Sequence, residues 1–327
     1  MSNLKIFGLM SSKPFAKKIA DHLDIELSEH EEHVFEDGEV YLKSNQNVRG
    51  CDVYVIVSLF SDEQENVNQK LFKLAFFIAS LKDASADRIT AVIPYMAYAR
   101  QDRKDKSRSP ITTKYVAMIL ESVGTDRVLM MDVHNAGAEQ NAFRIPIDIL
   151  EAKTLLVDKC VEELSFEIDD DRFALLVPDT GGRERVENFR DVLSDRLQKD
   201  IHTYQLDKRR IDRKVTASRI GGDVKGKKLL IVDDMIASGG TIKKAKDVIE
   251  DAGGLLWGIA ATHGLFVGKI NENLRDIPRV FVTDTIDSFR LDDSNKRNLR
   301  IVNTDKMFSK AIRRIHSGQG SISELLS

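Results

Sequence analysis

Cysteine is scarce in this sequence, where Cys51 and Cys160 are the only two among 327 residues. Two cysteines are too few for a disulfide framework and form no metal-binding cluster, so both are expected to be structural in a reducing setting. No run approaches the roughly 18 apolar residues of a membrane span, and the first residues lack the apolar core of a signal peptide. These absences predict a cytoplasmic protein that is not embedded in a membrane.

Neither sign of charge is in large excess. The 49 Lys and Arg residues face 52 Asp and Glu residues, which gives a formal net charge of −3 and a pI of about 6.2. This balance provides no general attraction to nucleic acid or to an anionic membrane, so basic residues must act in local sites. With 42% hydrophobic residues the chain can bury a large core, and its length predicts two domains, residues 1–150 and 151–327.

Short β-rich apolar runs alternate along the chain with helical patterns. The expected strands are 5–8, 53–58, 89–94, 128–132, 174–178, 228–232, 256–262 and 279–282. Apolar residues at 71, 74, 75, 78 and 81, and again at 116, 119 and 120, have helical spacing. The alternation predicts an α/β fold with two similar doubly wound domains, each with a mainly parallel sheet that binds ligands beyond the carboxyl ends of its strands.

The stretch from Lys227 to Thr241 is the most informative about function. An apolar run ends in two adjacent carboxylates, Asp233 and Asp234, and a small-residue turn then leads into an expected helix. Glycines let the backbone approach an anion, and the hydroxyls and free amides at a helix start donate to it. The candidate phosphate-binding residues are Ser238, Gly239, Gly240 and Thr241. An ordinary strand-to-helix loop with solvated acids is the alternative, whereas the Walker and Gly-x-Gly-x-x-Gly spacings are absent.

A second stretch, residues 94–112, concentrates five cationic residues within nine positions. It follows an expected strand and precedes an expected helix, so its guanidinium and ammonium groups could neutralise a polyphosphate. A solvated charged face is the alternative. Nucleic-acid binding is disfavoured because only Tyr95 and Tyr98 could stack on bases.

Both stretches resemble segments of the ribose-phosphate diphosphokinases. In that family an acidic pair holds the 2- and 3-hydroxyls of ribose, and the following turn holds its 5-phosphate, as in type I phosphoribosyltransferases. The ATP-binding loop of the family begins with the Tyr-Ala-Arg-Gln-Asp run found here at 98–102. Other matching segments occur in the family's order, at 35–39, 47–50, 131–134, 177–182, 207–210, 261–266 and 311–316. The resemblance therefore covers nearly the whole chain and implies domains of the type I phosphoribosyltransferase kind.

The resemblance implies a diphosphoryl transfer. The anomeric hydroxyl of ribose 5-phosphate would attack the β-phosphorus of ATP, giving 5-phosphoribosyl 1-diphosphate and AMP, with in-line positioning, magnesium and cationic donors as the means. The residues that it assigns to ATP are Phe35, Asp37, Glu39, Arg100, Gln101 and Asp105. Those that it assigns to ribose 5-phosphate are Asp233, Asp234, Ala237, Ser238, Gly239, Gly240 and Thr241.

The resemblance also implies a metal and a set of catalytic residues. His134 and Asp179 would position Mg²⁺ directly or through water, although a buried structural histidine is the alternative for His134. Lys208 and Arg210 would stabilise the transition state from a mobile loop that closes over the phosphates, assisted by Arg100 and His134. A basic surface loop without a catalytic role is the alternative for Lys208 and Arg210.

Self-association is a further implication. Phe35, Asp37 and Glu39 match a segment that recognises adenine in a neighbouring subunit, so at least a dimer is expected, and the family commonly forms hexamers. Without the resemblance, Phe35 would be assigned to the core. A regulatory phosphate or ADP site is implied at Arg49, Arg108, Ser321 and Ser323.

Three departures from the family's pattern keep alternatives open. Ala237 stands where many relatives have an acid, residues 135–143 replace a Gln-rich segment with one more residue, and the tail is one residue longer around 318–321. A different acceptor such as ADP-ribose would fit these differences, whereas the intact turn at 238–241 favours a terminal 5-phosphate. A non-catalytic regulatory member of the family is the second alternative, and the presence of Arg100, His134, Asp179, Lys208, Arg210, Asp233 and Asp234 argues against it. A phosphoribosyltransferase that consumes the diphosphate is disfavoured by the run at 100–102 and by the match across both domains.

Overall fold

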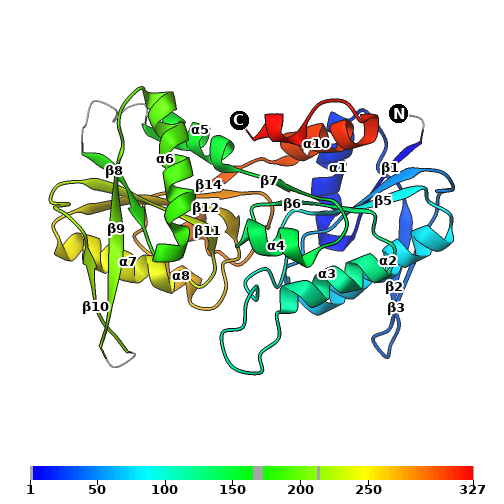
Figure 1. Ribbon diagram of the computed structural model, residues 1–327, viewed down its shortest axis with the longest axis horizontal. Coiled ribbons are helices and arrows are strands. Elements are labelled where there is room, and N and C mark those ends of the chain that lie inside the picture. The colour runs from blue at the N-terminus through cyan, green and yellow to red at the C-terminus, as the bar shows by residue number, and fades with distance from the viewer. Residues whose placement is uncertain (1–2, 165–171, 212–213, 327) are drawn as a thin grey trace. The chain divides into compact units, whose positions relative to one another are not determined.

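The chain forms two compact units. The computed structural model describes residues 3–164, 172–211 and 214–326, without the side chains of residues 180 and 207–218. Unit 1 consists of residues 1–151 and 304–327, and unit 2 of residues 152–303 (Figure 1). This partition differs from the expected division into 1–150 and 151–327 because the C-terminal helix packs with the N-terminal part of the chain. Among the described residues, no helix is both long and apolar enough to cross a membrane.

Unit 1 is built on a parallel sheet of five strands in the order β1-β4-β5-β6-β7. These strands are β1 (Leu4–Gly8), β4 (Asp52–Ile56), β5 (Arg88–Ile93), β6 (Arg127–Met131) and β7 (Ile147–Leu150). The helices are α1 (Lys13–His22), α2 (Val67–Asp83), α3 (Thr112–Ser122), α4 (Ala136–Ala142) and α10 (Asp305–Ser317), with 3-10 turns η1 (Met10–Ser12) and η3 (Ile322–Leu325). An antiparallel pair, β2 (His30–Val34) and β3 (Val40–Ser44), forms a separate hairpin.

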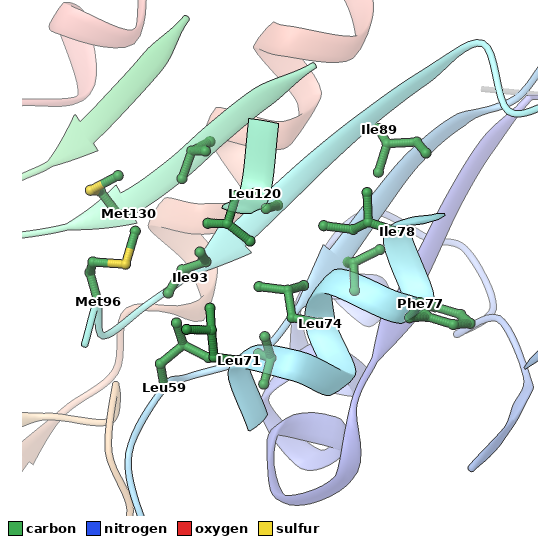
Figure 2. Packing of buried hydrophobic residues seen from close by; sticks show 14 of the residues in the cluster. Leu59, Leu71, Leu74, Phe77, Ile78, Ile89, Ile93, Met96, Leu120 and Met130 are labelled. Carbon is green, nitrogen blue, oxygen red and sulfur yellow. The ribbon is translucent and has the colours of Figure 1, made fainter. Parts of the chain in front are cut away.

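The core of unit 1 lies between its sheet and the amphipathic helices. Helix α2 begins at a capping box in which Asn66 accepts backbone hydrogen bonds and Gln69 bonds back to the Asn66 amide. Figure 2 shows Leu74 of α2 and Leu120 of α3 packed with Ile93 of β5 in one apolar cluster. Each such buried side chain contributes roughly 1.5–3 kcal/mol. The regular apolar spacing of α2 therefore fixes which face of this helix packs on the sheet.

Helices from opposite ends of the chain cover the other face of the same sheet. Helices α1 and α10 lie there together, opposite α2, α3 and α4 (Figure 1). The rings of Phe15 and Phe308 meet edge to face at 5.6 Å, and His22 Nε2 lies 2.6 Å from Asp305 Oδ2. These contacts explain why residues 304–327 belong to unit 1.

Unit 2 has a seven-stranded sheet in the order β10-β9-β8-β11-β12-β13-β14, parallel except for the β9–β10 pair. Its strands are β8 (Phe173–Val177), β9 (His202–Ile211), β10 (Lys214–Ile220), β11 (Lys228–Ile236), β12 (Leu255–Gly264), β13 (Val280–Thr283) and β14 (Leu299–Val302). Its helices are α5 (Lys153–Leu164), α6 (Arg183–Leu197), α7 (Gly240–Asp251), α8 (Ile270–Asn273) and α9 (Asp293–Lys296), with a 3-10 turn η2 (Thr180–Gly182). The expected α/β fold with mainly parallel sheets is confirmed, and each expected strand overlaps an observed one.

Candidate active site

The strand order of unit 2 reverses between β8 and β11. From β8 the chain continues to β9 on one side, and from β11 it continues to β12 on the other. In open α/β sheets such a reversal leaves a crevice beyond the carboxyl ends of the two central strands, where ligands bind. Asp179 follows β8, and Asp233 and Asp234 lie near the end of β11. The topology thus collects these three acids at one edge of the sheet, and we call them, with residues 237–241, the acidic site.

The two carboxylates of β11 face an arginine from α6. Arg185 Nη1 lies 3.4 Å from Asp233 Oδ1, and Arg185 Nη2 lies 3.7 Å from Asp234 Oδ2. Burial and the neighbouring charge of Asp234 raise the pKa of Asp233 above its usual range, against the opposing charge of Arg185. A pair of crowded carboxylates is well suited to accept hydrogen bonds from ligand hydroxyls or to face a cation.

The turn after β11 is held in a shape that only glycine adopts easily. Gly239 has φ +74°, and a Cβ there would lie 3.0 Å from Asn273 Cβ and 3.1 Å from Ile270 Cδ1. Asn273 Nδ2 also donates to the Ser238 carbonyl at 2.8 Å. Helix α8 therefore braces the turn. The amides at the start of α7 lie directly after it, where the helix dipole favours an anion.

The remaining predicted residues of unit 2 lie in the turn after β8 and on the neighbouring strand β9. Asp179 caps η2, and its Oδ1 accepts from the amides of Gly181 and Gly182 at 3.0 and 3.1 Å. Lys208 and Arg210 are on β9, paired in register with Ser218 and Val215 of β10. Their side chains lie outside the described part of the chain. Both residues thus belong to a hairpin whose strand β9 directly neighbours β8.

In unit 1 three of the predicted ATP residues, Arg100, Gln101 and Asp105, follow β5 in a long loop, residues 94–111, which we call the cationic loop. Its first part is anchored, because Tyr95 to Ala97 are buried and the Thr113 hydroxyl donates to the Tyr98 carbonyl at 2.9 Å. The side chain of Gln101 accepts from the Thr112 hydroxyl at 2.5 Å. Arg100 and Asp105 are exposed to solvent. The cations are therefore presented from a fixed base.

The residues after β6 adjoin the cationic loop. His134 is exposed, so the alternative of a buried histidine is excluded, and Asn135 begins α4 by accepting from the Ala138 amide. Asn135 Nδ2 donates to Asp102 Oδ2 at 2.9 Å and so joins α4 to the loop. Glu139 of α4 is 1% exposed, and among the described residues neither of its carboxylate oxygens has a hydrogen-bond partner. Burial and the charge of Asp102 raise the pKa of Glu139 to about 7.

The residues predicted to recognise adenine, Phe35, Asp37 and Glu39, lie at the tip of the β2–β3 hairpin. We call this hairpin, residues 30–44, the arm. The arm extends away from the five-stranded sheet (Figure 1). Phe35 is 47% exposed, which excludes its assignment to the core. The Glu39 amide donates to Asp37 Oδ1 at 3.1 Å, and the Phe35 amide donates to the Glu39 carbonyl at 2.8 Å. These bonds order the tip that carries all three residues.

The predicted regulatory residues all belong to unit 1. Arg49 is exposed in the turn before β4, and Arg108 has φ +69° in the cationic loop. The hydroxyls of Ser321 and Ser323 lie 2.6 Å apart, and Arg314 donates to the Ser321 carbonyl. Within the described ranges, no hydrogen bond joins either serine to Arg49 or Arg108. Nor do three or more His, Cys, Asp or Glu side chains gather as a metal cluster there.

Sequence reasoning missed three residues of these sites, Arg185, Asn273 and Glu139. Arg185 lies in the first turn of α6, shortly after the Gly181-Gly182 pair that follows β8. A side chain at this position can reach the carboxyl ends of the strands, where ligands bind. Its place after the Gly-Gly pair was therefore a signal in the sequence. Asn273 and Glu139 gave no local signal, because their roles depend on packing between elements distant in sequence.

The architecture and sites define an α/β protein with phosphoribosyltransferase-like domains. Residues 4–124 match the model of the N-terminal domain of ribose phosphate pyrophosphokinase, and residues 195–327 match that of the phosphoribosyl synthetase-associated domain. The ribose-phosphate pyrophosphokinase of Caldanaerobacter subterraneus is 38% identical over 100% of this chain and 98% of its own length. That of Shewanella oneidensis is also 38% identical, over the full length of both. The chain therefore belongs to the ribose-phosphate pyrophosphokinase family.

The solved structures agree with this assignment. The phosphoribosylpyrophosphate synthetase of Mycobacterium smegmatis superposes with a TM-score of 0.86 and 30% sequence identity, covering 97% of this chain and 100% of the other. The similarity thus extends through both units, as the order of the motifs in the sequence predicted.

Proposed function

We propose that this chain transfers the β,γ-diphosphoryl group of ATP to the C1 hydroxyl of ribose 5-phosphate, releasing 5-phosphoribosyl 1-diphosphate and AMP. The observation that carries the proposal is the acidic site, where Asp233 and Asp234 face Arg185 beside a glycine turn at the start of α7. This site offers acceptors for sugar hydroxyls and donors for a phosphate within one short segment. Both are needed to hold a phosphorylated pentose.

In the proposed complex the two carboxylates accept hydrogen bonds from the 2- and 3-hydroxyls of ribose. The 5-phosphate binds to the hydroxyls and amides of the turn, in the positive field of the α7 start. Ala237 to Thr241 form this cradle. Bracing by Asn273 keeps the amides in place before the sugar arrives, which lowers the entropy lost on binding.

ATP is proposed to bind in unit 1. Arg100 and Gln101 would hold phosphate or ribose oxygens, and Asp105 would order the loop around them. The exposed tip of the arm would recognise adenine through Phe35, with Asp37 and Glu39 as hydrogen-bond acceptors. This contact is proposed to occur in a neighbouring subunit, so the active form would be at least a dimer, and a hexamer by the habit of the family.

Mg²⁺ is the proposed metal. His134 and Asp179 would hold it directly or through water, and the exposed positions of both leave room for that water. Mg²⁺ keeps several waters and substrate phosphates as ligands, so it does not need a closed cluster of protein side chains. When bound, it neutralises charge on the triphosphate.

Lys208 and Arg210 are proposed to stabilise the transition state. Negative charge moves onto the bridging oxygen between the α- and β-phosphates as AMP leaves, and two cations can neutralise it without forming a covalent intermediate. Arg100 and His134 would assist by orienting the phosphates. The free thiols Cys51 and Cys160 fit a cytoplasmic location for this reaction.

A product assay tests the proposal. Purified protein is incubated with Mg²⁺, ATP and ribose 5-phosphate, and the nucleotide product is identified. AMP is expected in equal amount to 5-phosphoribosyl 1-diphosphate, whereas ADP would show ordinary kinase chemistry and no product would favour a regulatory family member. A parallel incubation with ADP-ribose addresses the second acceptor, for which the motivation is that Ala237 stands at a position where many relatives have an acid.

A further inference from the structure

The arm has an exposed tip, but its base is buried and charged. We call this base, formed by His30 and Glu32 of β2 with Lys73 of α2, the foot. On β2, His30 Nε2 lies 2.8 Å from Glu32 Oε1, and the other oxygen of Glu32 lies 3.4 Å from Lys73 Nζ of α2. The exposed fractions of these side chains are 8%, 8% and 2%. A lysine buried this completely is uncommon unless its charge is paired. The chain therefore places an ion network where the arm joins the body of unit 1.

Several elements converge on this network. Lys73 also pairs with Glu65 from the loop before α2, and the Met10 amide donates to Glu32 Oε1 at 3.1 Å. The His30 ring packs against Phe77 with centroids 5.1 Å apart. Glu32 is thus held by α2, by its own strand and by the turn after β1. These three directions leave little freedom for the foot to rotate.

The charges of the foot depend on one another. Burial opposes the ionisation of Glu32, but the hydrogen bond from His30 and the charges of His30 and Lys73 outweigh it and hold the pKa of Glu32 below its usual range. Removing one partner would leave another charge buried and unpaired, which is strongly unfavourable. An apolar foot could supply comparable stability, whereas ionic contacts also specify direction.

Movement at the foot would be transmitted to the tip. The ladder from His30 paired with Ser44 to Val34 paired with Val40 makes the arm one continuous ribbon. Phe35 is three residues beyond Glu32, about 10 Å along a strand. A two-stranded ribbon is only marginally stable alone, so its direction depends on what holds its base.

We propose that Lys73 and Glu32 are positioning residues, which fix the direction of the arm and so place Phe35, Asp37 and Glu39 for recognition of the adenine of ATP. The inference rests on the proposed function, in which the tip binds ATP. Lys73 and Glu32 contact no substrate in this scheme, and they act only through the ribbon that they hold.

Helix α2 supplies a matched control. Lys70 is also buried, with 1% of its side chain exposed, and its Nζ lies 2.5 Å from Asp62 Oδ2 and 2.7 Å from Ser11 Oγ. The described contacts of Lys70 do not involve the arm. Lys73→Met and Lys70→Met each remove one buried charge from the same helix and retain most of the apolar stem. The two variants should therefore lose stability alike and differ only in the arm.

Steady-state kinetics of the full-length protein provide the first measurement. In Lys73→Met we expect the KM for ATP to rise at least tenfold, with the KM for ribose 5-phosphate and kcat within about twofold of wild type. In Lys70→Met all three should stay within about twofold. Glu32→Gln keeps the shape of the side chain and loses its charge, so it should raise the KM for ATP by about threefold to tenfold. This variant replaces Lys73→Met as the test if Lys73→Met does not fold.

Hydrogen exchange of the arm amides provides the second measurement and needs no turnover. Amides of residues 31–43 should exchange faster in Lys73→Met or Glu32→Gln, and at the wild-type rate in Lys70→Met. Unchanged exchange in both foot variants would overturn the inference. Faster exchange with an unchanged KM for ATP would also overturn it, while leaving the proposed reaction intact. A wild-type protein that forms no AMP would instead refute the proposed function, with the exchange result unaffected.

Discussion

The acidic site and the cationic loop use charge in opposite ways. In the acidic site, Asp234 is 4% exposed, faces an arginine, and sits beside a turn that α8 braces. In the cationic loop, Arg103 and Asp105 pair at 3.6 Å with 80% and 74% of their side chains exposed. An exposed pair of this kind contributes little to stability. If both sites bind their proposed ligands, we expect the acidic site to be formed beforehand and the exposed part of the cationic loop to adjust to the charge of its ligand.

This contrast suggests that the two proposed substrates are bound in different ways. A pentose phosphate is small and carries specific hydroxyls, so a preformed site can discriminate it. A triphosphate is large and highly charged, so an exposed loop can attract it and then close around it. The following variants test this comparison, beginning with the largest expected effect.

The largest effect is expected from Lys208→Ala. If its ammonium stabilises charge mainly in the transition state, kcat should fall by about a thousandfold while both KM values change little. Circular dichroism and thermal unfolding should match the wild type. Lys225→Ala, an exposed lysine elsewhere in unit 2, should retain full turnover. Unchanged kcat in Lys208→Ala would remove this residue from the catalytic scheme.

Removing the acids should affect the sugar more than the nucleotide. Asp233→Asn with Asp234→Asn eliminates both charged acceptors, so we expect the KM for ribose 5-phosphate to rise about a hundredfold, with the KM for ATP within a few-fold of wild type. The exposed Asp251 at the end of α7 is the control, as Asp251→Asn. Equal increases in both KM values would contradict the separation of the two sites.

A smaller effect on the same site is expected from Gly239→Ala. The added methyl group meets α8 at about 3 Å and the left-handed backbone becomes strained, so the turn must shift. The KM for ribose 5-phosphate should rise about tenfold. Gly226→Ala carries a similar φ of +70° with nothing within 4 Å of the new Cβ, and it should lose stability without this change in KM. An equal effect on KM in both variants would show that the turn is not preformed.

The smallest effect concerns stability near the cationic loop. Because the pKa of Glu139 is raised to about 7, the folded protein keeps a proton that the unfolded chain loses at about pH 4.3. The contribution of Glu139 to the stability of the wild type should therefore fall as the pH rises through this window. Glu139→Gln removes this contribution, so the free energy of unfolding of the variant minus that of the wild type should be larger at pH 8 than at pH 4 by about 1–3 kcal/mol.

Urea denaturation at several pH values measures this difference. Glu26→Gln, at an exposed position, retains Glu139, so the difference in stability between this variant and wild type should stay the same at every pH. A constant difference between Glu139→Gln and wild type from pH 4 to pH 8 would mean that Glu139 is paired or solvated.

The predictable part of the fold was the part built from apolar runs. Strand β5 and the first part of β11 are largely apolar runs, and α2 has a regular apolar stripe, so these patterns located them. The arm strand His30–Val34 contains His-Glu-Glu-His, and it pairs with β3 while Lys73 of α2 lies against the charge of Glu32. The place of α10 in unit 1 likewise depends on contact with α1, which no local pattern reveals.

The residues of the candidate sites likewise fall into those that the sequence predicted and those that it did not. Asp233, Asp234 and the Gly-Gly turn were found because one continuous segment carries them. Arg185 was missed because it approaches that segment from another helix, and Glu139 was missed because its unusual environment arises from burial alone. Short-range patterns identify residues that act together along the chain, whereas contacts across the fold require the structure.

The interrupted course of unit 1 has a consequence for synthesis. Its last helix, α10, is translated only after the whole of unit 2, and α10 supplies Asp305 and Phe308 to the contacts with α1. On a ribosome, the continuous unit 2 has its complete sequence first, while the N-terminal segment waits for its final helix with the α1 face uncovered. A chain truncated at residue 303 would keep that face permanently open to chaperones and proteases.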